Sequence, residues 1–502
     1  MPKLYLDAIE HARVYEVARE TPLELAPKLS ERLGNEVLFK REDLQPVFSF
    51  KLRGAYNKIA QLSDEECSHG VICASAGNHA QGVALSAKKR GIKATIVMPR
   101  TTPDIKVKAV ESMGANVVLA GDSYSDASVH AYELRDKTGM IFVHPYDDPQ
   151  VIAGQGTIAE EILRQSPSDI DAVFIPIGGG GLAAGMALYL KHYSPSTKII
   201  GVEPEDSAAM HDSIKAGKRI ELEQVGIFAD GVAVKKVGKH TFDLVRQYVD
   251  EIILVDTDEI CAAIKDIYDD SRAIVEPAGA LAVAAMKKYV KRGSTQEEVL
   301  VCINSGANMN FDRLRHVAER TEVGEQREAL FAVTIPERAG SFLTFCDLLG
   351  DRSITEFNYR MSSRNEAHVF VGVSIQELDE SAQIQSLLEE NDYPVINLLE
   401  NELAKLHIRH MVGGKSPHTE NETLYRFEFP ERPGALLDFL TQLAGRWNIS
   451  LFHYRNHGAA FGRVLVGMEV SEGDKTKFQS FLDDLGFTYE NEDNNPAFRL
   501  FL

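Results

Sequence analysis

Four short stretches of this sequence hold residue types that could do chemistry. The first, SFKLRGAYNKI (residues 49–59), places Lys51 among apolar and small neighbours. Burial disfavours the charged form of a lysine, and a neutral amine is a nucleophile that can carry a carbonyl cofactor as a Schiff base. The alternative is a solvated lysine on a helix surface. Partners elsewhere in the sequence must therefore decide the role of Lys51.

The second stretch, PIGGGGLAAGMAL, places four glycines (178–181) between an expected strand and an expected helix. Four adjacent glycines lose much backbone entropy on folding, so their presence indicates a backbone that must approach something closely. The free N–H groups and the positive dipole at the start of a helix suit a phosphate. A tight turn without a ligand is the alternative.

The same stretch also fits a dinucleotide-binding pattern. Gly178, Gly180 and Ala183 match G-x-G-x-x-A, and Glu203 ends the next expected strand, where such folds place an acid that binds a ribose. A nicotinamide-dependent enzyme is therefore a local possibility. Four adjacent glycines exceed what this pattern requires, however, and a nicotinamide gives Lys51 no role.

The other two stretches also follow expected strands. ASAGNHAQG follows a strand at 71–73 and opens a helix near Asn78, whose amide could fix an oxygen of a bound ring. In CINSGANMN, Ser305 follows a strand at 299–303, at the strand end where α/β sheets bind ligands. The alternatives are a plain helix cap with His79 on the surface, and an ordinary Ser-Gly turn. The turn after the first strand could bind a carboxylate through the N–H groups of Ser75, Ala76, Gly77, Asn78 and His79.

These motifs lie in a region, about 37–304, where short apolar strands alternate with helical stretches. Near-continuous apolar strands alternating with helices predict an α/β fold with parallel sheets covered on both faces. Ahead of this region, MPKLYLDAIEHARVYEVARETPLEL predicts a charged amphipathic helix without the apolar block of a signal peptide.

Beyond a polar segment near Arg320, the sequence repeats itself. LFAVTIPERAGSFLTFCDLLG (330–350) matches LYRFEFPERPGALLDFLTQLA (424–444), and ITEFNYR later matches ISLFHYR. Each copy predicts a strand, a PER-x-G turn, a helix, two strands, and a further helix and strand. This order is that of a ferredoxin-like α+β domain. The two domains either form only an oligomer interface or sense a ligand.

Composition narrows the class of protein. A chain of 502 residues exceeds one hydrophobic core and predicts several domains. With 54 basic and 74 acidic residues the net charge is −20, which disfavours nucleic acids and anionic membranes as partners. Five cysteines without a CxxC pair, and no apolar run near the ~18 residues of a membrane span, predict a reduced, cytoplasmic setting.

Taken together and in this order, SFKLRGAY, SAGNHAQG, GGGGLAAG and SGAN resemble fold type II pyridoxal-phosphate enzymes. Within that group the sequence resembles the biosynthetic threonine dehydratase (threonine ammonia-lyase) family over nearly the whole chain. Shorter degradative dehydratases and serine racemases lack the paired C-terminal domains. The resemblance implies a catalytic body of two parallel-sheet lobes at 1–320, a linker at 321–328, and ACT-like regulatory domains at 329–410 and 423–495.

The resemblance also implies a role for each motif. Lys51 would carry pyridoxal 5'-phosphate and then act as the base at the substrate Cα. Asn78 would contact the ring hydroxyl and Ser305 the ring nitrogen, while the 75–79 turn would hold the substrate carboxylate. No metal site is expected. The cofactor phosphate would be bound by the backbone of Gly178, Gly179, Gly180, Gly181 and Leu182.

The implied reaction is deamination of L-threonine to 2-oxobutanoate and ammonia, the first committed step of isoleucine biosynthesis. Isoleucine would inhibit it and valine would oppose that inhibition, in a homotetramer. Tyr359 with Arg360, and Tyr454 with Arg455, recur in both repeats and are candidates for the effector region; core tyrosines with surface arginines are the alternative.

Three other functions remain open from the sequence. The first is a serine dehydratase or racemase of the same fold. The second is a nicotinamide-dependent oxidoreductase. The third is an amino-acid-sensing protein on a non-catalytic dehydratase body, against which the retention of Lys51, Asn78 and Ser305 argues.

Overall fold

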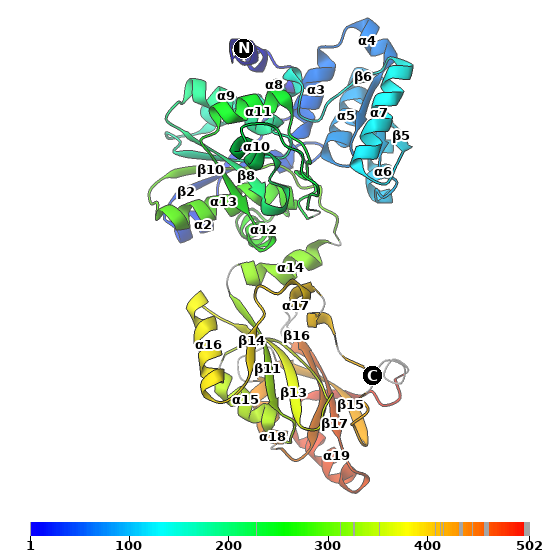
Figure 1. The fold of residues 1–502 in the computed structure, drawn as a ribbon, viewed down its shortest axis with the longest axis vertical. Helices are drawn as coiled ribbons and strands as arrows, with labels where there is room; N and C mark the ends of the chain where they lie inside the picture. The colour runs from blue at the N-terminus through cyan, green and yellow to red at the C-terminus, as the bar shows by residue number, and fades with distance from the viewer. Residues whose placement is uncertain are drawn as a thin grey trace. The chain divides into compact units, whose positions relative to one another are not determined.

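The protein forms two compact units, Met1–Gly324 and Glu325–Leu502 (Figure 1). A computed structural model describes residues 2–226, 228–311, 313–324, 327–350, 352–406, 408–411, 413–414, 416–430, 435–443, 445–455, 461–495 and 502. No helix in these ranges is long and apolar enough to cross a bilayer.

The first unit is built around a six-stranded sheet in the order β1-β2-β10-β7-β8-β9. All neighbouring strands are parallel except β1, which pairs antiparallel with β2 at the edge. The strands are β1 (Leu23–Leu25), β2 (Glu36–Arg41), β7 (Ala172–Pro176), β8 (Lys198–Pro204), β9 (Glu251–Val255) and β10 (Val299–Asn304).

Hydrophobic cores cover both faces of this sheet, as the sequence pattern predicts. Along β7, Phe174 joins one core cluster, while Val173 and Ile175 on either side of it join the other. Successive side chains of a strand point to opposite faces, so an uninterrupted apolar strand requires helices on both sides.

A second, four-stranded parallel sheet has the order β5-β4-β3-β6. It is built from residues 71–142, and its strands include those predicted at 71–73 and 94–98. The strands are β3 (Val71–Ala74), β4 (Ala94–Met98), β5 (Asn116–Leu119) and β6 (Ile141–Phe142).

Fourteen α-helices are described in the first unit. Their bounds are α1 (Pro2–Glu10), α2 (Pro27–Leu33), α3 (Lys51–Ala60), α4 (Asp64–His69), α5 (Asn78–Arg90), α6 (Asp104–Glu111), α7 (Tyr124–Thr138), α8 (Pro149–Gln165), α9 (Gly181–Tyr193), α10 (Ala209–Lys215), α11 (Lys239–Tyr248), α12 (Thr257–Ser271), α13 (Pro277–Gly293) and α14 (Arg313–Gly324).

The second unit contains two βαββαβ repeats, in agreement with the sequence. Their strands form one eight-stranded sheet in the order β14-β11-β13-β12-β16-β17-β15-β18. The first repeat comprises β11 (Glu328–Pro336), α15 (Ser341–Leu349), β12 (Ile354–Arg360), β13 (Glu366–Ser374), α16 (Leu378–Glu390) and β14 (Val395–Asn397), followed by α17 (Glu402–Leu406). The second comprises β15 (Glu422–Pro430), α18 (Ala435–Leu443), β16 (Asn448–Arg455), β17 (Phe461–Glu469), α19 (Lys475–Asp484) and β18 (Thr488–Asn491).

The repeats join where β12 pairs antiparallel with β16. The two homologous strands thus lie side by side, and helices of both repeats share one core cluster. In the second PER-x-G turn, residues 431–434 lie outside the described part of the chain.

Two expectations differ from the structure. The N-terminal helix ends at Glu10 rather than continuing to residue 25, because the following backbone is bonded to distant side chains: the Arg13 N–H donates to Asn57 Oδ1. The expected linker at 321–328 begins inside α14, which continues to Gly324, and ends inside β11. Buried Thr321 bonds the Cys261 carbonyl of α12, so this polar stretch gains a tertiary partner that its composition does not reveal.

The pairing of the repeats yields a stability prediction. The Phe357 ring on β12 packs against Phe342 and Phe345 of its own repeat and, at 5.2 Å between centroids, against Phe452 of the other. Phe357→Ala should lower the unfolding free energy of the second unit by about 3–5 kcal/mol, because it leaves a cavity shared by both repeats. Trp447, the single tryptophan of the chain, lies in this unit, so its fluorescence during denaturation measures the change.

Ile396→Ala is the matched control, since Ile396 is 65% exposed on β14 of the same unit. It should shift the transition by a few tenths of a kcal/mol. Equal shifts for the two variants would contradict the shared core.

Candidate active site

Lys51 is the first residue of α3, and its amine is desolvated and forms no ion pair within the described part of the chain. Burial lowers the pKa of the amine below its usual range, and the carboxylate of Glu276 opposes this only in part. The amine makes no hydrogen bond or ion pair with any residue in the described ranges; its nearest recorded contact is the Phe50 ring, 5.6 Å away. Lysines are seldom buried unless paired, and the Lys51 amine is desolvated although the residue as a whole is half-buried. It is therefore available as a neutral nucleophile.

Backbone pairing brings Ser305 next to Lys51. The segment before α3 and the segment after β10 form a short antiparallel bridge between Ser49 and Gly306. The Phe50 N–H donates to the Ser305 carbonyl (3.2 Å). The buried Ser305 hydroxyl donates to the Ala278 carbonyl (3.2 Å) and keeps lone pairs for another donor.

The amide of Asn78 belongs to a buried polar group. Its Nδ2 donates to Glu276 Oε1 (2.6 Å), and its Oδ1 accepts from Asn308 Nδ2 (2.7 Å). One N–H of Asn78 remains for a ligand. Burial raises the pKa of Glu276 to about 7, and nearby Asp230 adds to the rise. This carboxyl thus titrates near neutral pH, within the electrostatic range of Lys51.

The 75–79 turn provides fewer N–H donors than the sequence predicts. The Ser75 N–H continues the sheet by donating to the Val97 carbonyl, and that of Gly77 donates to Ser75 Oγ. In the described part of the chain, the N–H groups of Ala76, Asn78 and His79 have no recorded protein acceptor. Three donors at the start of α5 remain suited to a carboxylate.

His79 lies in the interior and not on the surface. Its Nε2 donates to the Val143 carbonyl (2.8 Å), and burial lowers the pKa of the ring to about 3. The imidazole is therefore neutral and structural, and only the backbone of His79 faces the turn.

Each of the four glycines in the 178–181 run lies against a close neighbour. A Cβ would meet the ring of Tyr146 from Gly179 and the Cε of Met210 from Gly180, whose φ is +95°. The distances from such a Cβ to its nearest atom would be 2.9 Å at Gly178, 2.2 Å at Gly179, 2.7 Å at Gly180 and 3.1 Å at Gly181.

This run also presents unpaired backbone donors. The Gly179 carbonyl points away from the run and accepts from Thr241 Oγ1 (2.6 Å), and no side chain caps the start of α9. Across the described ranges, no protein acceptor is recorded for the N–H groups of Gly178, Gly179, Gly180, Gly181 and Leu182. Buried N–H groups are nearly always satisfied, so these five indicate an anionic ligand at the helix start.

Glu203 rules against the dinucleotide interpretation. Its buried carboxylate accepts from the backbone N–H groups of Met210 and His211, both at 2.8 Å. Burial raises the pKa of this carboxyl to about 8, although the two hydrogen bonds oppose that rise. Glu203 holds α10, which supplies the methionine beneath Gly180, and is not directed at a ribose.

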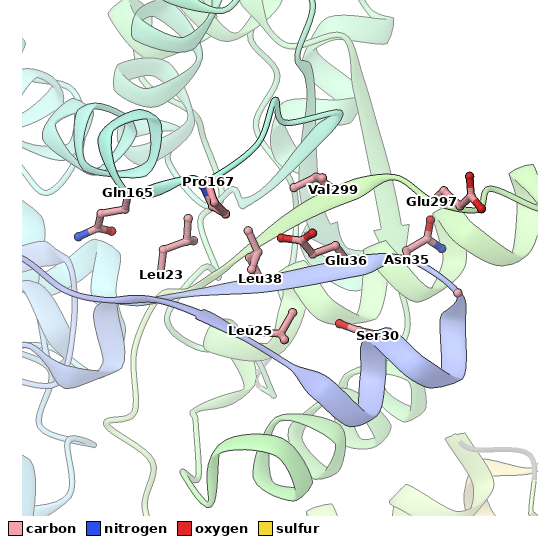
Figure 2. Close-up of a pocket in the computed structure, with 11 residues that line it drawn as sticks. Leu23, Leu25, Ser30, Asn35, Glu36, Leu38, Gln165, Pro167, Glu297 and Val299 are labelled. Carbon is pink, nitrogen blue, oxygen red and sulfur yellow. The ribbon is translucent and has the colours of Figure 1, made fainter.

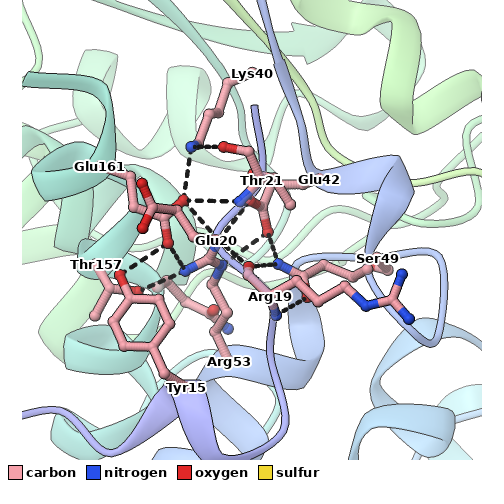
Figure 3. Close-up of polar contacts among 12 residues, drawn as sticks. Tyr15, Arg19, Glu20, Thr21, Lys40, Glu42, Ser49, Arg53, Thr157 and Glu161 are labelled. Atoms are coloured by element: carbon pink, nitrogen blue, oxygen red, sulfur yellow. Dashed lines mark hydrogen bonds and ion pairs between the residues drawn. The ribbon is translucent and has the colours of Figure 1, made fainter. Parts of the chain in front are cut away.

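A buried network of charges fixes α3 close to Lys51 (Figure 3). Arg53 pairs with Glu42 (2.7 Å) and Glu161 (2.6 Å), and Lys40 also pairs with Glu161 (2.6 Å). All four side chains are fully buried. Burial alone would lower the pKa of Arg53, but the two carboxylates hold it above its usual value. The network ties together β2, the loop after it, α3 and α8.

A hollow lies elsewhere on the first unit (Figure 2). It measures about 820 Å³ and is lined by residues at the amino ends of β2 and β10, such as Glu36 and Val299, together with Leu23 of β1. Ligands of parallel sheets bind at the carboxyl ends of the strands. The candidate residues follow those carboxyl ends, and none of them lines this hollow.

Comparisons with known proteins agree with this geometry. Residues 14–306 match a family model described as pyridoxal-phosphate dependent enzyme. Residues 319–408 and 413–502 each match the C-terminal regulatory domain of threonine dehydratase. The chain belongs to the pyridoxal-phosphate dependent enzyme family.

Close relatives of this family extend over the whole chain. A protein of Burkholderia multivorans named L-threonine dehydratase biosynthetic IlvA is 58% identical, over 99% of both chains. Its namesake in Escherichia coli is 54% identical over 99% of this chain and 97% of its own. The solved structure of threonine deaminase isoform 2 from Solanum lycopersicum is 52% identical, with a TM-score of 0.63 over 64% of this chain and 88% of that one.

The predicted fold class is thereby confirmed: a fold type II body is followed by two ACT-like regulatory domains. The cofactor of the family is pyridoxal phosphate. The residues present fit it, because an unpaired, desolvated lysine and five unpaired N–H groups at a helix start match its aldehyde and its phosphate.

Two members of the site were not predicted from the sequence. Glu276 stands directly before Pro277 at the start of α13, and an isolated acid at a helix start is too common to single out. Asn308 lies within the SGANMN stretch, but nothing in that stretch shows that its amide contacts Asn78, 230 residues away.

The charge network gives a second prediction. Arg53→Ala leaves two carboxylates buried without their cation and should destabilise the first unit by about 3–5 kcal/mol in chemical denaturation followed by circular dichroism. Arg53→Lys should lie in between, because an ammonium cannot bridge both partners in the way a guanidinium does. Arg164→Ala is the control: Arg164 is on α8, 51% exposed, and pairs at the surface with Glu20. Its loss should change stability by less than about 1 kcal/mol; a comparable loss in both variants would contradict a special role for the buried network.

Proposed function

We propose that this protein is a lyase that deaminates L-threonine to 2-oxobutanoate and ammonia with pyridoxal 5'-phosphate, at the first committed step of isoleucine biosynthesis. The observation that carries the proposal is the similarity of the whole chain, catalytic and regulatory parts alike, to proteins named biosynthetic L-threonine dehydratase. We further propose the domain bounds 1–320 for the catalytic part and 329–410 and 423–495 for the regulatory domains, with the rest of α14 extending the catalytic unit to Gly324.

The cofactor would be held by residues from three of the motifs. The unpaired N–H groups of Gly178 to Leu182 would bind the phosphate. The remaining N–H of Asn78 would donate to the ring hydroxyl, and the hydroxyl of Ser305 would face the ring nitrogen. When bound, pyridoxal phosphate supplies an aldehyde that an amine can attack and a conjugated ring that accepts electron density from Cα.

Lys51 would have two roles. A neutral Nζ can bond the cofactor, and the lowered pKa of Lys51 keeps more of the amine neutral near pH 7 than an exposed lysine would. After threonine takes its place, the freed Nζ is a general base that removes the proton from the substrate Cα. Nζ forms no ion pair with a described residue, and Glu276 offsets its desolvation only in part. Both roles benefit, because an ion pair would hold the amine protonated.

Threonine would be oriented by the 75–79 turn. Its carboxylate would accept from the N–H groups of Ala76, Asn78 and His79 at the start of α5, where the helix dipole favours an anion. This places the substrate between the turn and Lys51, since α5 packs on the start of α3: a Cβ on Gly82 would lie 3.3 Å from the backbone of Leu52.

The alternatives are less well supported. The structure of maize serine racemase is 35% identical, with a TM-score of 0.58, and 96% of that chain is spanned by 62% of this one. The remainder of this chain holds the regulatory repeats, which favours the threonine enzyme over a racemase. Glu203 argues against a nicotinamide enzyme, because its carboxylate accepts from the backbone of α10. The presence of Lys51, Asn78 and Ser305 argues against a protein that only senses amino acids.

The second unit would bind small-molecule effectors, with isoleucine as inhibitor and valine as its opponent. Of the two candidate pairs, Tyr359 and Arg360 are already engaged in contacts within the second unit. Tyr359 is buried and its hydroxyl donates to Glu337, while Arg360 pairs with Glu422. Tyr454 is half-buried, and the side chain of Arg455 lies outside the described part.

We also propose a homotetramer in the cytoplasm. The cytoplasmic setting is supported by five cysteines that are all free thiols. The tetramer follows the resemblance of the sequence to its family and is testable by analytical ultracentrifugation.

The proposed activity is tested at Lys51. Purified wild-type protein should be yellow, turn over L-threonine, and retain the cofactor covalently on the Lys51 peptide after borohydride reduction. Lys51→Ala should stay folded, lose at least about 1,000-fold in kcat, and take up no label, because nucleophile and base are both removed. Lys88→Ala, at an exposed lysine of α5, is the control and should match wild type. Substantial activity in Lys51→Ala would falsify the assignment.

The phosphate site is tested by a compensating pair. Gly179→Ala should weaken cofactor binding about tenfold or more, since its Cβ would lie 2.2 Å from the Tyr146 ring and displace the run. Tyr146→Ala in the same chain removes the obstructing ring and should recover part of the loss. Equilibrium titration with pyridoxal phosphate measures both, and a Gly179→Ala protein that binds like wild type would exclude this run as the phosphate site.

A further inference from the structure

The turn at residues 228–232 contacts the candidate site in two places, at the glycine run and beside Glu276. A Cβ on Gly178 would lie 2.9 Å from the Cα of Val232, so the turn touches the glycine run. A Cβ on Gly231 would lie 2.8 Å from the Cβ of Ala278 and 3.3 Å from Glu276 Oε1, so it also touches the buried polar group. The Val232 N–H closes the turn on the Ala229 carbonyl (3.0 Å). Its position therefore affects both the phosphate end and the ring end of the site.

Helix α14 holds this turn from outside. Arg313, its first residue, donates from Nη1 to the Phe228 carbonyl (2.9 Å) and to Asp230 Oδ1 (3.2 Å). One turn along the helix, the His316 ring packs on the Phe228 ring at 5.3 Å between centroids. Lys106 of α6 reaches the same Asp230 (3.1 Å), so the turn also connects to the smaller sheet region.

A second connection runs along the chain itself. Asn308, five residues before Arg313, donates from Nδ2 to Asn78 Oδ1 (2.7 Å) and to the Val47 carbonyl (2.8 Å). A displacement of the start of α14 thus reaches the Asn78 amide through Asn308, and Glu276 through the turn. Both routes end at the same buried hydrogen bond, the one from Asn78 Nδ2 to Glu276 Oε1.

The other end of α14 leads out of the first unit. Arg320 pairs with Asp258 of α12 (2.5 Å), and Thr321 bonds the Cys261 carbonyl. The helix has 12 residues and spans about 18 Å, and the chain enters the second unit at Glu325. A packed helix moves as a whole, so a shift at its C-terminal end is carried to Arg313.

We propose that Arg313 is a positioning residue that acts through the 228–232 turn on Glu276. Helix α14 thereby connects the regulatory unit to the cofactor site. The effector part of this inference rests on the proposed function, whereas the positioning part rests only on the contacts within the first unit.

The positioning part is tested on the holoenzyme without effector. Arg313→Ala should raise the dissociation constant of pyridoxal phosphate about threefold to tenfold and shift the absorption band of the bound cofactor. Arg313→Lys, which keeps one donor for the turn, should recover part of both changes. Arg315→Ala is the matched control, since Arg315 is 74% exposed on the same helix and pairs there with Glu319. An Arg313→Ala protein with the wild-type spectrum and cofactor affinity overturns the proposal.

The coupling part compares inhibition with binding. In wild type, isoleucine should inhibit threonine turnover. In Arg313→Ala, the inhibition midpoint should rise about threefold or more, while isoleucine binding measured by calorimetry stays within twofold of wild type. An unchanged inhibition curve, or the loss of isoleucine binding itself, contradicts the connection through α14.

The two proposals fail in different ways. A wild-type protein that does not turn over threonine contradicts the proposed activity. One that turns over threonine without responding to isoleucine contradicts the effector assignment and the connection that depends on it. In both cases the cofactor spectrum and affinity of Arg313→Ala still decide whether Arg313 positions the site.

Discussion

The desolvation of the Lys51 amine is the constraint around which the first unit is arranged. Placing an amine where its charged form is disfavoured is unfavourable for folding, and no ion pair with a described residue relieves it at Nζ. The helix that begins with Lys51 must therefore be held by other contacts. Two residues away, Arg53 enters a network of two cations and two carboxylates that is fully buried and internally neutral. Such a network is costly to break and has one arrangement, so it fixes α3 while leaving its first residue uncompensated. Arg53, which stabilises α3, and Lys51, the reactive residue, therefore lie about half a helical turn apart.

Around that lysine the ligand groups come from backbone more than from side chains. The glycine run and the 75–79 turn both end at helix starts, where N–H groups lack intrahelical partners. The glycines are needed because neighbours such as Tyr146 and Val232 press on the run, and any Cβ would push it out of position. Backbone donors do not titrate, so the donor strength of these two helix starts does not change with pH. Glu276, which accepts from Asn78, differs from these donors, because burial raises the pKa of its carboxyl to about 7.

The motifs and their order were predictable from the sequence because each one is local. A strand followed by small residues and a helix start is a signal spanning about ten residues, and the strands at 71–73, 94–98 and 299–303 are found within one residue of their observed ends. The repeat also could be read directly, since both copies keep the same βαββαβ order. The groups that escaped prediction are those created by strand order. Because β10 lies between β2 and β7, Gly306 reaches Ser49, and Glu276 and Asn308 then meet at Asn78. Glu203 was misinterpreted for the same reason. Its place in the sequence is that of a ribose-binding acid, but the backbone N–H groups of α10 donate to both of its carboxylate oxygens.

The sheet of the second unit joins its two repeats into one structural element. Its two repeats are not independent domains. Strand β12 of the first pairs with β16 of the second, and Phe357 packs on Phe452 across this junction. Because the two repeats share strand pairing and one core, a change in one of them is expected to reach the other. The first strand of this sheet, β11, begins at Glu328, shortly after α14 ends at Gly324. Within the first unit, the start of α14 holds Arg313 against the turn beside Glu276, which is the contact that the proposed coupling uses.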